Sequence, residues 1–185
     1  TMLSTDRWLL AAGLLSLGYS VNETDPAKLN EAKEKLISAK KNLLAYDDTV
    51  FYTKLVTGEA AMAHAWDGWC NYATWENPDV KFVVPSEGSD LWVDTMVIMK
   101  ASDNKDEAHA FINYILDPAI STWTVENIMY KVPNIYAMNA TSGMFEQFPN
   151  LGMSINELSQ NETLKDVGSA AKLYAKTVSE ILAAD

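Results

Sequence analysis

The sequence predicts an α/β fold built on a mainly parallel or mixed sheet. Segments with apolar residues at helical spacing alternate with short apolar runs, and Gly or Pro residues bound those runs, as is typical of buried strands. Ala60–Ala65 and Thr95–Met99 are the clearest runs, and each meets a Trp and an Asp at one end. The 185 residues are enough for one domain, or two small ones, with a buried core.

Capping and turn residues delimit the elements of the first half. Gly18 follows a helix over Ser4–Leu17, and glycine is common just after a helix end. Asp25-Pro26 begins the next helix, because proline fits the first helical turn. In order, the elements expected before residue 90 are helices over 4–17 (capped by Ser4 or Thr5), 26–43, 49–54 (capped by Asp48 or Thr49) and 69–75, and strands over 43–46, 60–65 and 80–84.

The second half begins with Leu91–Lys100, which shows little alternation and is expected to be a strand buried on both faces. Asn104 and Glu107 have the spacing of a capping box at the start of a helix. Asp117-Pro118 ends that helix and begins another. The remaining expectations are a loop-like region with one short helix over 139–162 and an amphipathic helix over 165–183.

Charge and cysteine content restrict the function. A formal net charge of −11 argues against nucleic acid, whose backbone needs basic contacts, and favours cationic partners only mildly, because acidity also serves solubility. Cys70 is the sole cysteine, so neither an internal disulfide nor a zinc cluster is expected. No apolar run approaches the roughly 18 residues of a membrane span. The chain starts abruptly in a helical pattern without a signal peptide, as if cut from a longer protein.

Aromatic rings and carboxylates gather beside the two apolar runs. Trp66, Asp67 and Trp69 follow the first run, while Trp92 and Asp94 precede the second. Aromatic faces attract positive charge and carboxylates neutralise it, so this pattern favours a site for an organic cation. Asp67 and Asp94 could also form an acid/base pair as in glycosidases, but no nucleophile motif, phosphate loop or metal cluster supports an enzyme. We expect no catalysis, no metal and no cofactor.

An ordered series of motifs resembles the bacterial spermidine/putrescine-binding proteins, the extracytoplasmic receptors of polyamine ABC importers. The similarity spans almost the whole chain, and its most specific parts are the Pro-x-Glu-Gly…Trp-x-Asp run and the helix ending in Asp-Pro. The matching residues are Leu17-Gly18-Tyr19-Ser20, Thr24-Asp25-Pro26, Gly58-Glu59, Trp66, Pro85-Ser86-Glu87-Gly88, Trp92-Val93-Asp94, Asn104-Lys105, Ala110–Pro118, Tyr130–Asn134 and Asp166-Val167-Gly168.

This resemblance implies a type II periplasmic-binding-protein architecture, in which two lobes enclose the ligand in a cleft. Members of the family are about twice this long, so the chain corresponds to the C-terminal half. Residues 1–90 would form the main part of the second lobe, residues 91–138 would complete the first lobe, and residues 139–185 would return to the second. The implied location is periplasmic or extracellular, with any membrane anchor in the absent N-terminal part. The implied partners are that N-terminal half and a membrane permease.

The resemblance also assigns site residues. Trp66 falls on a cleft tryptophan, Trp92 and Asp94 on the pair that packs against the ligand chain and holds its amine, and Tyr130 on a tyrosine near the cleft. Asp67 and Trp69 join this set from the cluster of aromatic rings and carboxylates, and not from the resemblance. Four features depart from the family: Thr5 and Trp8 stand at acidic positions, Leu164 stands at a glutamine, and Asp67 directly follows Trp66. The ligand is therefore a polyamine, a shorter diamine or another organic cation, and a sugar or other uncharged solute is the alternative.

Overall fold

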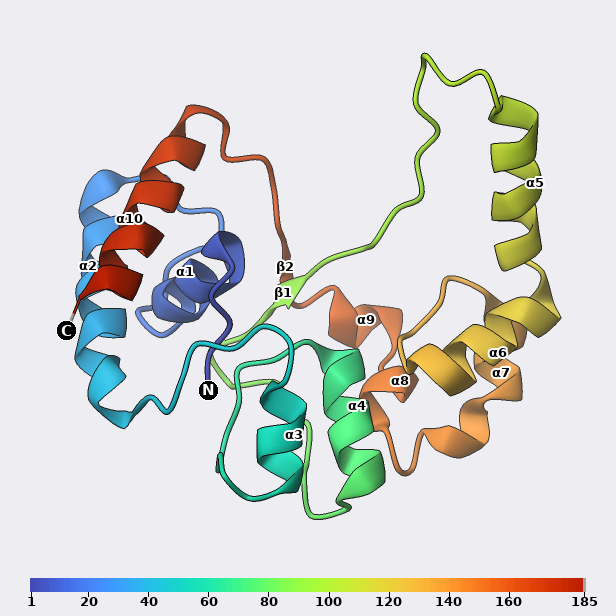
Figure 1. Ribbon diagram of the computed structural model, residues 1–185, viewed down its shortest axis with the longest axis horizontal. Helices are drawn as coiled ribbons and strands as arrows, with labels where there is room; N and C mark the ends of the chain where they lie inside the picture. Colours follow the sequence, from blue (N-terminus) through green and yellow to red (C-terminus); the bar gives the residue numbers. More distant parts are fainter. Residues whose placement is uncertain (185) are drawn as a thin grey trace.

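The computed structural model describes residues 1–184, and helices dominate it (Figure 1). The sheet consists of two strands of two residues each. In chain order the elements are α1 (Asp6–Leu15), α2 (Pro26–Ala39), the 3-10 helix η1 (Lys40–Asn42), α3 (Phe51–Val56), α4 (Asp67–Glu76), β1 (Asp90–Leu91), α5 (Lys105–Ile115), α6 (Pro118–Ile128), α7 (Ile135–Ala140), η2 (Ser142–Met144), α8 (Pro149–Gly152), α9 (Ile155–Leu158), β2 (Glu162–Thr163), η3 (Gly168–Ala170) and α10 (Ala171–Ala183).

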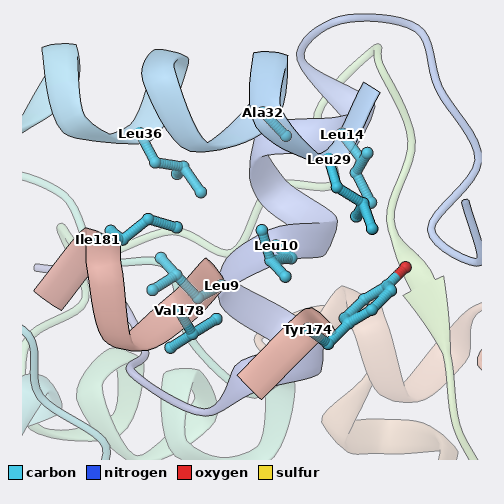
Figure 2. Close-up of a cluster of buried hydrophobic side chains, with 9 residues drawn as sticks. All are labelled: Leu9, Leu10, Leu14, Leu29, Ala32, Leu36, Tyr174, Val178 and Ile181. Carbon is cyan, nitrogen blue, oxygen red and sulfur yellow. The ribbon is translucent and has the colours of Figure 1, made fainter. Parts of the chain in front are cut away.

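The largest core joins both ends of the chain. Helices α1, α2 and α10 pack together, and their apolar faces meet as predicted from helical spacing (Figures 1 and 2). The Tyr174 hydroxyl donates a hydrogen bond of 2.6 Å to the carbonyl of Glu23, so the one phenol in this core is satisfied. The buried members of this core are Leu9, Leu10, Leu14, Leu29, Ala32, Leu36, Tyr174, Val178 and Ile181.

A second, smaller cluster lies around α6. Val125, Met129, Phe148 and Leu151 are buried together, and Tyr72 of α4 packs against them. The Asn71 side chain donates a hydrogen bond of 2.8 Å to the carbonyl of Met129, which also ties α4 to the end of α6. Helix α4 is thereby held in a fixed position relative to the residues that follow α6.

Most predicted helix ends are confirmed, with two corrections. The Asp25 carboxylate accepts a hydrogen bond from the N–H of Ala27 at 2.8 Å, and Asp117 caps α6 in the same way. The predicted capping box at Asn104 is wrong, because Asn104 has φ −110° and ψ 48° and makes no side-chain cap. Asp47, and not Asp48 or Thr49, supplies the carboxylate oxygen at the start of α3.

The C-terminal region is also more structured than predicted. A capping box does form at α9, between Ser154 and Glu157. Residues 139–162 contain η2, α8 and α9 as well as the end of α7, where one short helix was expected. The last helix, expected from residue 165, begins at Ala171, after η3. The positive φ of 55° at Gly168 marks the turn that redirects the chain there.

The predicted strands are the main error. Residues 60–65 and 80–84 form no strand, only Leu91 of 91–100 lies in one, and 43–46 is reduced to a single parallel bridge between Met2 and Tyr46. β1 pairs with β2 in parallel, Asp90 opposite Glu162 and Leu91 opposite Thr163. A strand needs a run of ladder hydrogen bonds with a neighbour. Within the described chain, residues 60–65 make only two such contacts, both with Thr1: its amino group donates to the Met62 carbonyl, and its carbonyl accepts from the His64 N–H. The apolar side chains of the predicted strands stay open, with Met62, Val83, Val93, Val97 and Met99 between 72 and 81% exposed.

Helix α5 also leaves apolar side chains exposed. A long connection after β1 carries it away from the rest of the molecule (Figure 1). It has no buried residue, although Phe111 and Tyr114 give it a distinct apolar face. A helix in a globular protein buries such a stripe. Together with the unpaired segments, α5 therefore presents a surface that has no partner within the described residues.

Candidate functional site

Three tryptophans from distant parts of the sequence meet at one place. Trp8 of α1 lies edge-on to Trp66, with ring centroids 6.3 Å apart and an interplanar angle of 84°. It lies edge-on to Trp92 as well, at 6.3 Å and 90°. Trp66 is the N-cap residue of α4, and Trp92 directly follows β1. Edge-to-face packing of this kind is favourable for aromatic rings, so the cluster brings α1, α4 and β1 together.

A second group forms beside this tryptophan cluster, at the first turn of α4. The Asp67 carboxylate accepts a hydrogen bond of 3.3 Å from the side-chain amide of Asn150. Burial raises the pKa of Asp67, while that amide and the positive charge of Lys131 lower it in part. The ring of Tyr130 packs directly over Gly68, because a Cβ added to Gly68 would lie only 2.0 Å from Cε2 of that ring.

Asp94 belongs to this second group by its electrostatic effect. Burial raises the pKa of Tyr130, and the negative charges of Asp67 and Asp94 raise it further. Asp94 itself lies exposed on the connection that follows β1. The negative charges of both carboxylates thus act on the Tyr130 hydroxyl.

Trp69 is placed differently from the other predicted site residues. Its ring stacks on Tyr52 of α3 with centroids 5.0 Å apart, and it contacts Tyr72 at 5.5 Å. It therefore helps to hold α3 against α4. Trp66 and Trp92 meet through Trp8, and Asp67, Asp94 and Tyr130 gather next to them. The part that each of these residues plays toward a ligand stays a prediction.

Two residues of this region were not among the predicted site residues. Trp8 lies at the centre of the tryptophan cluster, and its buried indole N–H lies near the carboxyl of Asp90, whose pKa it lowers. Oδ2 of Asp90 is buried and also lacks a hydrogen-bond partner. Burial raises the pKa of the Asp90 carboxyl, and the nearby Trp8 indole and Arg7 guanidinium offset only part of the rise. The sequence does contain a signal for Asp90, since it precedes Trp92 and Asp94 at alternate positions.

Two hollows on the surface of the described residues are not lined by the predicted site residues, although Asn150, which donates to Asp67, lines the first. One, of about 410 Å³, lies between Phe82, Val84 and the α8–α9 region. The other, of about 240 Å³, lies beside the β1–β2 pair and includes Gly88 and Glu162. Within residues 1–184 no three His, Cys, Asp or Glu side chains are arranged to hold a metal ion. No helix there has the length and apolar character needed to cross a bilayer.

Comparison with known proteins gives a consistent result. The family model for bacterial extracellular solute-binding proteins matches residues 1–151. The spermidine/putrescine-binding periplasmic protein 1 of Haemophilus influenzae is 30% identical over 183 residues, which cover 99% of this chain and 51% of that protein. The chain therefore spans about half the length of the curated relatives it matches.

Solved structures agree with the sequence comparison. The spermidine/putrescine ABC transporter substrate-binding protein of Streptococcus pneumoniae superposes with a TM-score of 0.78 at 27% identity, over 98% of this chain and 56% of that one. The Tp0655 lipoprotein of Treponema pallidum gives a TM-score of 0.82 at 25% identity, over 97% of this chain and 56% of that one. Each of these structures thus continues well beyond the part that this chain matches.

Proposed function

The chain belongs to the bacterial extracellular solute-binding proteins, and from this premise we propose that it forms half of a receptor that binds a small organic cation between two lobes. The cation is a polyamine or a similar amine. The relatives named above are spermidine/putrescine-binding proteins, and the type II periplasmic-binding-protein-like fold predicted from the sequence is confirmed for about half of such a protein. The receptor would act outside the cytoplasm and deliver its ligand to a membrane permease, without chemistry.

The observation that carries this proposal is the pairing of the tryptophan cluster with carboxylates. Indole faces attract cations and also pack against methylene groups, whereas carboxylates form charge-assisted hydrogen bonds with ammonium groups. Asp67 and Asp94 both act on Tyr130 through their negative charge, and each stands within two residues of Trp66 or Trp92 in the chain. An anionic ligand would be repelled by the negative charge of both carboxylates, and an uncharged one would leave them without a counter-charge.

Each predicted residue has a distinct role in the proposal. Asp94 accepts hydrogen bonds from a ligand ammonium, and Trp92 and Trp66 form walls for the carbon chain. Tyr130 adds a hydroxyl beside that ammonium. Asp67 contributes negative charge, and burial raises its pKa because the nearby charge of Lys131 offsets the cost of burial only in part. Trp69 supports α4 through its stack on Tyr52, so we expect it to stabilise the fold without contacting the ligand.

The second partner is the N-terminal half present in the relatives. The apolar side chains left open along residues 60–65, 80–84 and 92–99, and the apolar face of α5, are the surface on which that half would pack. In this proposal residues 1–90 and 139–185 belong to the second lobe and 91–138 complete the first. The lobes would close about segments near Gly88–Leu91 and Pro133–Asn139.

The proposal is tested by Asp94→Asn in the complete natural polypeptide that contains this chain. We expect calorimetry to show at least tenfold weaker binding of putrescine and spermidine, with unchanged circular dichroism, because one charge-assisted bond is lost. Asp79→Asn, at an exposed turn, removes the same charge elsewhere and should leave affinity unchanged. Undiminished amine binding in Asp94→Asn would refute the assignment. Sugars that raise the melting temperature while amines do not would favour the uncharged-solute alternative.

A further inference from the structure

Asp90, Trp92 and Asp94 stand at alternate positions of one segment. In an extended chain, side chains at alternate positions point to the same face. Asp90 lies in β1, and pairing with β2 fixes the direction in which that strand runs. A carboxylate, an indole and a second carboxylate should therefore follow one another along a single face.

Contacts with Trp8 agree with this arrangement for the first two residues. The ring of Trp92 meets Trp8 edge-on at 6.3 Å. The carboxyl of Asp90 lies near enough to the same indole for Trp8 to lower its pKa. Asp94 continues the face toward Tyr130, whose pKa it raises. The row of three side chains thus runs from Trp8 to Tyr130.

Asp90 makes no ion pair within the described residues, although the charge of Arg7 and the indole of Trp8 lower its pKa in part. Its Oδ2 is buried and has no hydrogen-bond partner of normal geometry. Arg7 is the nearest cation that affects it, but the Arg7 guanidinium donates to the Lys165 carbonyl at 2.6 Å and to the Asn22 side chain at 2.8 Å. A buried carboxylate without a partner is costly, so its retention here needs a reason. A ligand ammonium would supply the missing donor and charge.

The separation of the two carboxylates limits the length of the ligand. Four residues of extended chain span about 13 Å at ~3.3 Å per residue. A chain of four carbons between two nitrogens has five bonds of about 1.5 Å and spans roughly 6 Å. Charge-assisted bonds of ~2.8 Å at each end place the two acceptor oxygens roughly 12 Å apart. Spermidine is several ångströms longer, and its central nitrogen would face Trp92 and not a carboxylate.

We propose that Asp90 is the second ammonium-binding carboxylate of the site and that the ligand is an α,ω-diamine of four or five carbons. Asp94 binds one ammonium, Asp90 binds the other, and Trp92 packs on the methylene groups between them. This inference rests on the proposed function and makes it specific, because it selects short diamines over longer polyamines and over monoamines.

The test compares putrescine with butylamine, which has the same carbon chain but one nitrogen. In the complete natural polypeptide, we expect calorimetry to show that Asp90→Asn weakens putrescine binding at least tenfold and leaves butylamine binding within twofold. Glu87→Gln, at an exposed loop three residues away, is the matched control and should change neither affinity. Asp90→Glu extends the carboxylate by one methylene and should shift the preferred diamine toward one carbon fewer.

Several outcomes would overturn the inference. Putrescine bound equally well by wild type and Asp90→Asn would exclude a ligand contact. Equal weakening of putrescine and butylamine would give Asp90 a purely structural role at β1. If Asp90→Asn does not fold, the affinities of the wild type for putrescine and spermidine decide. A preference for spermidine over putrescine would contradict the separation of the two carboxylates. Absence of any amine binding by wild type would instead refute the proposed function itself, whereas the first two outcomes leave that function intact.

Discussion

Gly68→Ala tests the link between packing at α4 and the proposed site. Gly68 is buried in the first turn of α4, beneath the ring of Tyr130. An added Cβ would lie 2.0 Å from Cε2, 2.2 Å from Cδ2 and 2.5 Å from Cζ of that ring. Ordinary carbon–carbon contacts are about 3.5–4.0 Å, so the ring would have to withdraw by roughly 1.5 Å.

The expected magnitude follows from two opposing terms. Overpacking of this kind costs about 1–3 kcal/mol, and alanine is better than glycine in a helix by up to ~1 kcal/mol. We therefore expect the free energy of unfolding to fall by about 1–2 kcal/mol. Because Tyr130 would also move relative to Asp67 and Asp94, amine affinity should fall roughly tenfold, or about 1.4 kcal/mol.

Denaturant unfolding and calorimetric titration of the complete polypeptide measure both effects. Gly143→Ala is the control, because a Cβ at Gly143 meets nothing within 4 Å and should leave both quantities unchanged. Adding Tyr130→Ala completes a double-mutant cycle, in which the stability cost of Gly68→Ala should disappear. The same cost in both backgrounds, or wild-type affinity in Gly68→Ala, would show that the ring is not what the new methyl group displaces.

Three further predictions concern stability. Burial lowers the pKa of His64 to about 4 in the folded protein. The unfolded chain, with an ordinary histidine pKa near 6.5, therefore binds the proton more tightly than the folded one. Acidification from about pH 6.5 to 4 should reduce the free energy of unfolding by up to roughly 3 kcal/mol. His64→Gln should flatten this dependence in urea titrations at several pH values, and the same change at exposed His109 should not. Asp25→Ala removes the N-cap of α2 and should cost about 1 kcal/mol in denaturant unfolding, whereas retained stability would make that hydrogen bond dispensable. Trp69→Leu should lower the melting temperature through loss of the stack on Tyr52 but leave amine affinity unchanged, and a weakened affinity would instead place Trp69 in the site.

Helix positions could be predicted from the sequence because their signals are local. The Asp25-Pro26 and Asp117-Pro118 starts depend on one carboxylate and one ring within a single turn, and both form as expected. Asn104 shows the limit of such signals. Its spacing to Glu107 fits a capping box, but its backbone does not take the extended conformation that the box needs.

Strands could not be predicted in the same way, because a strand depends on a neighbour that the local sequence does not contain. Residues 60–65 and 80–84 have the apolar composition of buried strands, yet neither forms a strand. The relatives extend over about twice the length that this chain covers, so partners for these segments can lie in that remaining part. An apolar run thus indicates where a segment is meant to be buried, but not whether its partner belongs to the same half.

The candidate site could be predicted only in part, because some of its residues stand in short motifs and others do not. Trp66, Trp92 and Asp94 stand in short motifs that can be recognised one at a time. Trp8 is different, because its helical spacing in α1 is equally typical of a core residue. Only the fold reveals that it meets both Trp66 and Trp92, 58 and 84 positions further along the chain.

Local charge, and not the net charge of −11, explains why this region would select a cation. None of the ion pairs within residues 1–184 involves Asp67, Asp90 or Asp94. The two nearby cations are directed elsewhere: Lys131 donates to the Leu151 carbonyl at 2.6 Å, and Arg7 donates to the Lys165 carbonyl. Backbone carbonyls therefore hold the cations while the carboxylates remain unpaired beside aromatic rings. Such an arrangement is costly without a ligand and favourable with one, as expected for a receptor that closes only around a positively charged solute.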